Sequence, residues 1–281
     1  MRPMNTRANT TMPFMKMHGL GNDFVVVDGR TRAFNLTEKQ ITAIADRHKG
    51  VGFDQLAVIE TSSSADAHLV FYNADGSTSA ACGNATRCIA RHLMDESGTS
   101  NLTLTTDRGT LYARDAGNDL TSVNMGQPQL LWDEIPLARE MDTLELPIDG
   151  GPTATGMGNP HCTFFVENAE AVDLSEFGAR HEHHALYPER TNVQVAQIIG
   201  ENHIRMRVWE RGVGITLASG SSSCATAVAA HRRGLTDRKV RIELDGGTIW
   251  IDWREDGVWM TGQTEHVMSG TFSAAFLERA K

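Results

Sequence analysis

The sequence predicts an α+β protein made of two similar domains in tandem. Short apolar runs of strand length, separated by Gly, Asn, Asp and Ser turns, recur along the 281 residues. Fewer segments have the apolar period of a helix. The same order of strands and helices then occurs twice, which is the pattern that an internal duplication leaves.

The first half opens with a glycine turn and a β-branched run, residues 24–27, which indicates a buried strand. A helix is expected over 37–48, where Thr37 has the position of an N-cap and Gln40 that of its capping-box partner. The elements expected next are strands at 56–60 and 68–72, a helix at 85–94 ending near Gly98, and a β-meander at 102–106, 110–114 and 120–124.

The second half follows a candidate linker, residues 126–147, which contain three prolines and no clear period. It opens with another glycine turn at 156–161. Its helices are expected near 175–183 and 221–233, and its strands at 162–166, 193–199, 204–209, 240–244, 248–253 and 258–262.

A constant offset of 137 positions supports the duplication. It carries five positions of the first half onto equivalent loops or helix starts in the second: Asn22 onto Asn159, Gln55 onto Asn192, Asn73 onto Glu210, Cys82 onto Ser219 and Gly83 onto Gly220. We therefore predict a disordered tail at 1–11, an N-terminal domain over 12–127 that 269–281 rejoin, and a C-terminal domain over 128–268.

Composition limits the function classes. The formal net charge is −9 without a basic stripe, which disfavours a nucleic-acid or anionic-membrane partner. No apolar run approaches the ~18–20 residues of a membrane helix, and the polar start of the chain lacks the apolar region of a secretory signal. The four cysteines have no C-x-x-C spacing, so we expect reduced thiols in a cytoplasm rather than zinc ligands.

The segment Asn73–Arg91 places Cys82 directly before a helix start. Unpaired N–H groups and the positive end of the helix dipole lie at such a position. This setting lowers a thiol pKa from ~8.5 towards ~3.5–7.5, so Cys82 is a candidate base or nucleophile. The alternative is a buried, inert cysteine beside a glycine turn.

Two similar domains usually bind their ligand in the cleft between them. The backbone N–H groups of Gly83-Asn84 and Gly220-Ser221, at two helix starts, are suited to hold a carboxylate there. A proton-transfer group on each face of the ligand would then suit stereoinversion at the carbon next to that carboxylate. Loop amides that need a polar partner in the cleft, unless they are only turn residues, are Asn22, Gln55, Asn159 and Asn192.

Three further residues in the paired loops are ionisable. His161 and Glu210 are placed to tune the bases, and Glu210 is also suited to hold an ammonium group. Arg211 is suited to bind a second carboxylate through its guanidinium fork.

Several motifs closely resemble those of the diaminopimelate epimerase family. They are HGLGNDFVVVD, GFDQ, NADGS, ACGNATRC, GNPHC, ERTNV and WERGVGITLASGS, spread from Met15 to Met268. The resemblance implies two α+β domains, each a mixed sheet curled around a central helix, and a homodimer. It also implies an isomerase that needs neither PLP nor a metal and interconverts LL- and meso-diaminopimelate, on the route to lysine and peptidoglycan.

The resemblance assigns roles residue by residue. Cys82 matches a catalytic cysteine, and His161 and Glu210 match the residues that assist the bases. The backbone of Gly83-Asn84 and Gly220-Ser221 matches the carboxylate cradle. Substrate contacts are matched by Asn22, Gln55, Asn73, Asn159, Asn192 and Arg211.

Ser219 departs from the family, whose second catalytic position is a cysteine. The duplication also predicts a thiol there, opposite Cys82. A serine hydroxyl is hardly ionised near neutral pH and is a poor carbon base. Three interpretations remain: an epimerase whose cysteine was deliberately replaced, a natural paralogue with reduced or altered chemistry, and an active enzyme that uses the nearby Cys224.

Other functions would fit the same cleft. One is a related isomerase or dehydratase of a hydroxy amino acid, and another is an amino-acid-binding protein without catalysis. A PLP racemase is disfavoured because none of the five lysines, except marginally Lys49, falls in the paired loops. His181, His183 and His184 are clustered, but a polar, solvated helix face explains them more simply than a metal site.

Overall fold

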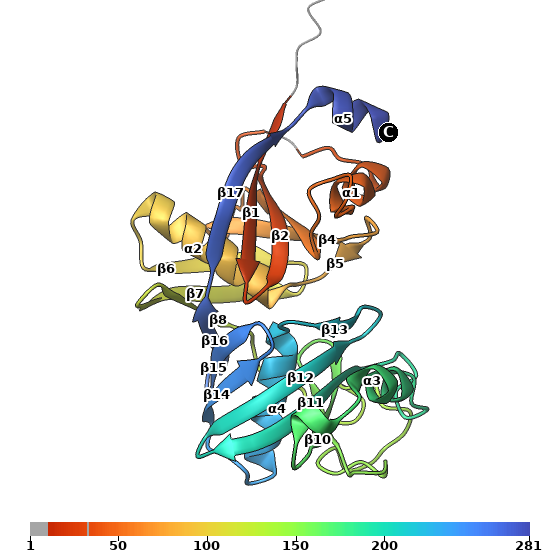
Figure 1. Cartoon of the computed structure of the whole chain (residues 1–281). Coiled ribbons are helices and arrows are strands. Elements are labelled where there is room, and N and C mark those ends of the chain that lie inside the picture. The colour runs from red at the N-terminus through yellow and green to blue at the C-terminus, as the bar shows by residue number, and fades with distance from the viewer. Residues whose placement is uncertain (1–10, 33) are drawn as a thin grey trace, which may run out of the picture.

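The computed structural model describes residues 11–32 and 34–281, so residues 1–10 of the predicted tail lie outside the described residues. Two lobes are stacked along one long axis (Figure 1). Elements from both ends of the chain form the upper lobe in this view, and the middle of the chain forms the lower lobe.

The upper lobe is a mixed sheet curled around helix α2 (Gly83–Ser97). Its first eight strands are β1 (Met12–Gly19), β2 (Asn22–Asp28), β3 (Gln55–Glu60), β4 (Ala67–Asn73), β5 (Thr78–Ser79), β6 (Asn101–Thr106), β7 (Gly109–Gly117) and β8 (Leu120–Asn124).

Both faces of this sheet are covered, which explains the continuous apolar run in β2. Val26 packs in the cluster that contains the buried face of α2. Its neighbours Val25 and Val27 pack with Ile41 and Ile44 of helix α1 (Glu38–Ala45) on the other side.

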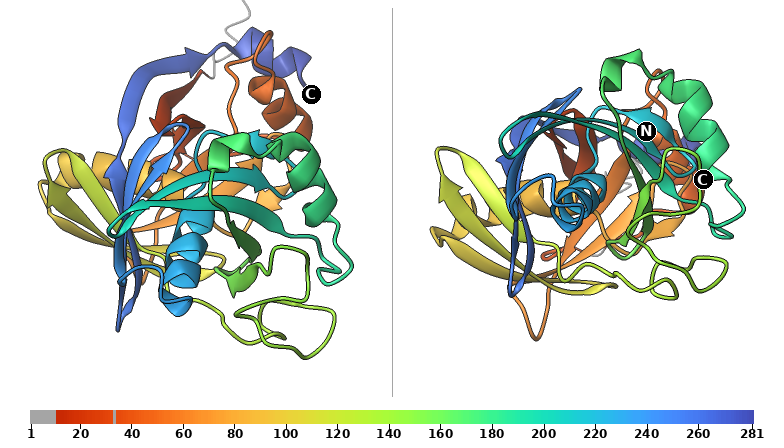
Figure 2. Two further views of the ribbon diagram at one scale, coloured as in Figure 1. Left: turned by 60° about the horizontal axis from the view of Figure 1, so that its bottom comes forward. Right: turned by 90° about the horizontal axis from the view of Figure 1, so that it is seen from below.

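The lower lobe repeats the arrangement around helix α4 (Gly220–Arg232), which Figure 2 shows surrounded by its strands. Helix α3 (Leu174–Glu182) has the place of α1, and a 3-10 turn η1 (Ala169–Ala171) precedes it. Its strands are β9 (Thr153–Gly156), β10 (Pro160–Phe165), β11 (Asn192–Gly200), β12 (His203–Glu210), β13 (Gly214–Thr216), β14 (Lys239–Leu244), β15 (Gly247–Arg254) and β16 (Gly257–Gln263).

Strand register confirms the duplication. The parallel pair β2 and β3 sets Phe24 opposite Gln55, and the parallel pair β10 and β11 sets His161 opposite Asn192. Both residues of the second pair lie 137 positions after those of the first. The two lobes are therefore two copies of one supersecondary unit.

Two strands join the lobes. β16 pairs antiparallel with β8, with Thr261 opposite Ser122, so the two sheets are continuous. β17 (Glu265–Phe272) follows and pairs along β1 in the upper lobe, and helix α5 (Ala274–Arg279) ends the chain there. Where the domain boundaries fall along these joints stays a prediction.

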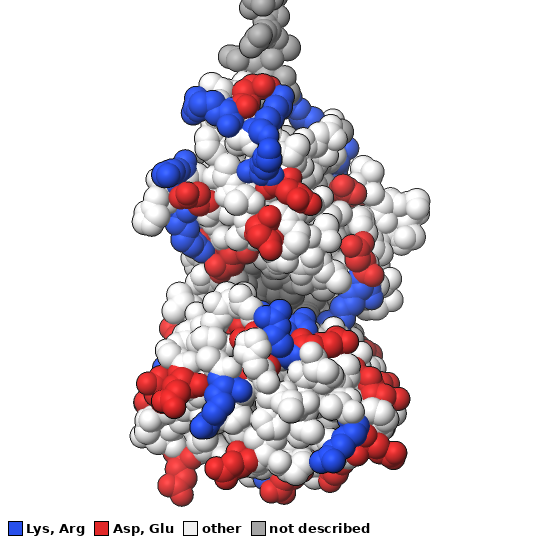
Figure 3. Space-filling view, turned by 90° about the vertical axis from the view of Figure 1, so that its right-hand side faces the viewer, with Lys and Arg blue, Asp and Glu red and all other residues white. Residues whose placement is uncertain are grey.

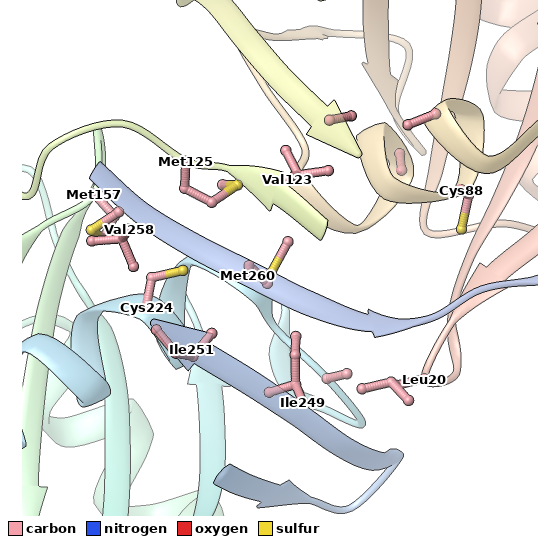
Figure 4. Close-up of a cluster of buried hydrophobic side chains, with 14 of the residues drawn as sticks. Leu20, Cys88, Val123, Met125, Met157, Cys224, Ile249, Ile251, Val258 and Met260 are labelled. Atoms are coloured by element: carbon pink, nitrogen blue, oxygen red, sulfur yellow. The ribbon is translucent and has the colours of Figure 1, made fainter. Parts of the chain in front are cut away.

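The hydrophobic core is also continuous between the lobes. Met125 follows β8, Met157 follows β9 and Met260 lies on β16, and all three are buried in one cluster with Cys224 of α4 (Figure 4). Within the described residues, no helix is both long and apolar enough to cross a membrane.

Every helix and strand predicted above is present, with ends shifted by a few residues. The capping box of α1 is confirmed, since the Thr37 hydroxyl accepts from the Gln40 N–H and the Gln40 side chain accepts from the Thr37 N–H. Elements that were not predicted from the sequence are β1, β5, β9, β13, β17, η1 and α5.

The predicted linker is not a free connection. Residues 126–147 contain no helix or strand, but Ile135, Leu137 and Leu146 are buried against Phe164 and Val193 of the lower lobe. The segment has no regular secondary structure, but its apolar residues are part of a hydrophobic core. They are buried there although they follow no helical or strand period.

Candidate functional site

Helices α2 and α4 begin between the lobes, and their first turns are in contact. Cys82 is the N-cap residue of α2 and Ser219 is that of α4. A Cβ atom on Gly220 would lie only 3.2 Å from Asn84 Oδ1. The surface between the lobes is hollowed in Figure 3, as expected for a cleft.

Cys82 is half-buried at the start of α2. Its Sγ accepts the Ala85 N–H at 3.5 Å, and the Thr86 hydroxyl donates to its carbonyl oxygen at 2.8 Å. Burial, together with the nearby acidic groups Glu210 and Cys88, raises the pKa of the Cys82 thiol to about 12. The expected lowering of this pKa is wrong for this conformation, because desolvation outweighs the N–H groups of the helix start.

Ser219 is buried and hydrogen-bonded to Glu210. Its hydroxyl donates to Glu210 Oε2 at 2.9 Å, and the Thr216 hydroxyl donates to Glu210 Oε1 at 2.6 Å. Burial raises the pKa of Glu210, although both hydrogen bonds oppose the rise. The charge of Glu210 also raises the pKa of Cys82. The structure therefore brings Cys82, Ser219 and Glu210, all predicted from the sequence, into one electrostatic environment.

His161 is fully buried next to the cleft. Its Nε2 lies 2.9 Å from Asn159 Oδ1, and its Nδ1 lies 3.1 Å from Gln194 Nε2. Burial, together with the charges of Arg108 and Arg211, lowers the pKa of His161 to about 3. His161 is therefore a neutral imidazole at physiological pH, and these partners place its hydrogen on Nε2.

The predicted amides are oriented by one another, by the Asp54 carboxylate or by nearby backbone. Asn84 Nδ2 donates to Asn22 Oδ1 at 3.1 Å, and Asn22 Nδ2 donates to Asp54 Oδ2 at 2.7 Å. Gln55 Nε2 donates to Asn73 Oδ1 at 3.0 Å. These hydrogen bonds link Asn22 directly to the helix start and make Gln55 and Asn73 a second pair.

Asn192 and Arg211 form a third group, on the lower lobe. Asn192 is buried, donates to Pro160 O at 2.9 Å and accepts the Arg211 N–H at 3.0 Å. Arg211 Nη1 donates to Glu189 O at 3.1 Å. No hydrogen bond among the described side chains joins this group to Cys82 or Ser219.

Several residues around the site were not predicted from the sequence. Asp54 accepts a hydrogen bond from Asn22, and Thr216 donates one to Glu210. Both lie in motifs quoted above, GFDQ and WERGVGITLASGS. Arg108, at the turn between β6 and β7, reaches the other lobe, because a Cβ on Gly158 would lie 2.1 Å from its Cζ. No pattern in the sequence around this turn indicates that contact.

Outside the cleft, the structure corrects the prediction for His181 and weakens the interpretation that uses Cys224. His181 does not lie on a solvated face as predicted: it is buried against the rings of Phe164 and Phe177. Cys224 is fully buried inside α4, and burial raises the pKa of its thiol to about 12, so it is not placed to act as the second base. Over residues 11–32 and 34–281, no group of three His, Cys, Asp or Glu side chains is arranged to hold a metal ion.

Solved structures share the whole fold at low identity. A phenazine biosynthesis protein of the PhzF family from Bacillus anthracis superposes with a TM-score of 0.67 at 16% identity, covering 94% of this chain and 99% of that one. A hydroxyproline epimerase from Agrobacterium vitis superposes with a TM-score of 0.65 at 13% identity, covering 94% of this chain and 93% of that one. Such likeness supports the two-lobed fold and no particular reaction.

Sequence comparison identifies the family. The family model described as diaminopimelate epimerase matches residues 14–131 and 153–267. The diaminopimelate epimerase of Rhodospirillum centenum is 52% identical over 271 residues, covering 94% of this chain and 93% of the relative. That of Acidiphilium cryptum is 49% identical over 270 residues, covering 94% and 98%. This chain belongs to the diaminopimelate epimerase family, whose members are PLP-independent isomerases.

Proposed function

We propose that this protein is an amino-acid epimerase that interconverts LL- and meso-diaminopimelate by proton transfer at one α-carbon, for lysine and peptidoglycan synthesis. The observation that carries the proposal is the pair of helix N-caps, Cys82 and Ser219, whose helices start in contact from opposite lobes. Relatives named diaminopimelate epimerase, similar over most of the chain, support the substrate.

The carboxylate next to the reacting carbon would be held by the backbone N–H groups of Gly83-Asn84 and Gly220-Ser221. These groups head two helices, so both helix dipoles favour an anion between them. When the α-proton leaves, negative charge moves towards the same carboxylate. Donors that are already in place stabilise this charge without reorganisation, which lowers the barrier.

Cys82 would serve one face of the α-carbon. Since burial raises its pKa to about 12, the thiol is protonated and suited to deliver a proton to a carbanion. It becomes a base only where a bound ammonium group or added N–H donors stabilise the thiolate. His161 is neutral, and its hydrogen bond orients the side chain of Asn159. It therefore adds no charge that would compete with Cys82 for the proton.

Ser219 would serve the other face, and we propose that it does so poorly. A serine hydroxyl has no acidic pKa near neutrality, and this one already donates to Glu210 at 2.9 Å. The remaining contacts of the substrate would come from Asn22, Gln55, Asn73, Asn159, Asn192 and Arg211.

Substitution at position 219 tests this mechanism. We expect Ser219→Cys to raise epimerisation by at least ~100-fold, because a thiol supplies general acid–base catalysis on the second face. Cys82→Ala should abolish turnover in both backgrounds. Loss of α-deuterium and change of stereochemistry of LL- and meso-diaminopimelate are the measurements.

Three outcomes would count against the proposal. Equal turnover by the parent protein and its Ser219→Cys variant would contradict the two-thiol mechanism. Tight binding of diaminopimelate without α-deuterium exchange, even in the Ser219→Cys variant, would favour an amino-acid-binding protein. A keto or imino product from a hydroxy amino acid would favour the isomerase or dehydratase alternative.

We also propose a cytoplasmic homodimer. Among the described strands, β17 pairs with β1 alone, so its other edge is unpaired. Val267 and Met268 on this strand are 54% and 49% exposed. A second copy would extend the sheet about a two-fold axis and cover this edge. The four free cysteines support a reducing compartment.

A further inference from the structure

Arg87 is the largest completely buried side chain in the described part of the molecule. It lies on α2, five residues after Cys82. Its Nη1 donates to Asn84 Oδ1 at 3.0 Å and its Nε to Gln263 O at 3.4 Å. Its Nη2 is buried without a hydrogen-bond partner.

No described carboxylate compensates the charge of Arg87. The titratable groups that act on it are the thiols of Cys88, Cys82 and Cys224, which carry a negative charge only when they ionise, and burial lowers the pKa of Arg87. Burying a guanidinium without a counter-ion is costly. Arg91, one turn further along α2, shows the usual alternative, since it forms ion pairs with Asp95 and Asp115 at the surface.

The fold makes room for this guanidinium with two glycines. A Cβ on Gly19 would lie 2.7 Å from Arg87 Nη2, and a Cβ on Gly262 would lie 3.3 Å from its Cζ. Gly19 ends β1 in the upper lobe, and Gly262 is the last residue but one of β16, which joins the two lobes. Arg87 is therefore held where strands of the two lobes meet.

The hydrogen bond from Arg87 to Asn84 continues into the candidate site. Arg87 has only donors, so it fixes the amide oxygen of Asn84 towards itself and the amide nitrogen towards Asn22. Asn22 in turn donates to Asp54. The oriented chain and the positive charge both lie beside the first turn of α2, where a helix dipole already favours an anion.

We propose that Arg87 is a positioning residue whose uncompensated charge and hydrogen bond to Asn84 stabilise an anion at the start of α2. That anion is the Cys82 thiolate or a substrate carboxylate held by Gly83-Asn84. The second case rests on the proposed function, whereas the first does not.

Alkylation of Cys82 by iodoacetamide tests the effect of the charge on the protein as it stands. The other three cysteines are fully buried, so peptide mass mapping resolves Cys82. The titratable groups that face it besides Arg87 are Glu210 on β12 and Cys88 on α2, and both stay unchanged in the variants. The neutral variants Arg87→Met and Arg87→Gln should slow alkylation at pH 9 by about tenfold.

Two variants act as controls. Arg87→Lys keeps the charge and should stay within about threefold of the parent rate. Arg91→Met removes a paired arginine from the same helix and should leave the rate unchanged. Should Arg87→Met not fold, Arg87→Gln supplies the neutral side chain with a donor of its own. Alkylation at the parent rate in a folded neutral variant would overturn the proposal.

Protection by meso-diaminopimelate tests the effect on substrate. The concentration that halves the alkylation rate should rise at least about tenfold in the neutral variants, since the carboxylate loses a counter-charge. An unchanged concentration would refute this part of the proposal. If the parent protein itself is not protected, the proposed function fails, while the alkylation rates without substrate still decide the role of Arg87.

Discussion

Glu210 links the two N-cap side chains electrostatically through its carboxylate. It accepts the Ser219 hydroxyl, and its charge adds to the pKa rise of Cys82. Burial raises the pKa of Glu210 itself. The folded protein therefore holds a proton on Glu210 more tightly than the unfolded chain does, and folding stability falls as the pH rises from the ordinary carboxyl value through the raised one.

Replacing Glu210 should therefore stabilise the fold at neutral pH. We expect Glu210→Gln to raise the melting temperature at pH 7 by about 2–4 °C, with the difference vanishing near pH 4, where the carboxyl is largely neutral in both states. Thermal unfolding followed by circular dichroism across this pH range is the measurement. Epimerase activity should fall at the same time, because both N-cap residues lose their charged neighbour.

Glu182 provides the matched control. It is buried in the lower lobe, where Glu210 is partly buried, but it accepts N–H groups from Trp209 at 2.7 Å and Gly212 at 2.9 Å, and it faces Arg190 at 3.4 Å. Glu182→Gln should lower the melting temperature at pH 7, because charge-assisted hydrogen bonds are lost. A similar fall for Glu210→Gln would mean that Glu210 stabilises the fold.

Which residues lie at the two helix starts could be predicted from the sequence, whereas the burial around them could not. The offset of the duplication placed Cys82 and Ser219 at equivalent helix starts, as the structure has them. The predicted direction of the Cys82 pKa is wrong, because desolvation depends on the packing of both lobes. Arg87 went unnoticed for the same reason, since a buried arginine and a surface arginine read alike within ACGNATRC.

At the scale of elements, three loops support one another beside the site. The Gly246 N–H, in the turn between β14 and β15, donates to Leu217 O at 2.8 Å in the loop before α4. Leu217 packs on the turn between β1 and β2, where a Cβ on Gly21 would lie 2.7 Å from its Cδ1. A Cβ on Gly246 would lie 1.9 Å from Leu20 O in that same turn. Two loops of the lower lobe therefore pack against one turn of the upper lobe.

A methyl group at Gly246 should disturb this support. The clash is with backbone, which cannot move aside as a flexible side chain would, so we expect Gly246→Ala to lower the melting temperature by about 3–10 °C. Binding of diaminopimelate should weaken as well, since Leu20 adjoins the loop that carries Asn22. Calorimetric unfolding and binding are the measurements.

Gly200→Ala is the control, because its Cβ would lie 3.6 Å from His203 Cβ, an ordinary contact. This variant should keep both the melting temperature and the affinity of the parent. Equal behaviour of the two alanine variants would show that the contact of Gly246 with Leu20 does not hold the lobes together.

Elements with a clear local signal were predictable. The capping box indicated α1, and β-branched runs indicated β2 and β11. β1 was missed because Met12–Gly19 contains no β-branched residue, and β17 because its first five residues are exposed and mostly polar. Both are stabilised by pairing with each other across the length of the chain, which no local pattern records.

The whole molecule depends on pairings between its distant parts. β8 and β16, which make one sheet of the two lobes, are separated by almost the whole sequence of the lower lobe. The duplication predicted two similar units, and the strand register confirms them. It could not predict how the units join, because each copy contains the same internal signals and none for the contact between copies.

The edge of β17 that no described strand pairs with is the feature of the whole molecule that carries the homodimer proposal. An exposed strand edge with apolar side chains is a template for pairing unless a partner covers it. We expect the protein to have twice the mass of one chain in light scattering at micromolar concentration. Val267→Glu should yield the monomer, since a second copy would bury two glutamates near a two-fold axis.

Ile199→Glu serves as the control for this last prediction, because Ile199 is a similarly exposed apolar residue, 40% accessible, on β11 of the other lobe. It should leave the mass of the dimer unchanged. A dimer that persists in Val267→Glu and dissociates in Ile199→Glu would move the interface to the lower lobe. A monomeric parent would mean that the exposed edge of β17 is not covered by a second copy, and the charge of Glu265 at the start of the strand would then oppose aggregation at this edge.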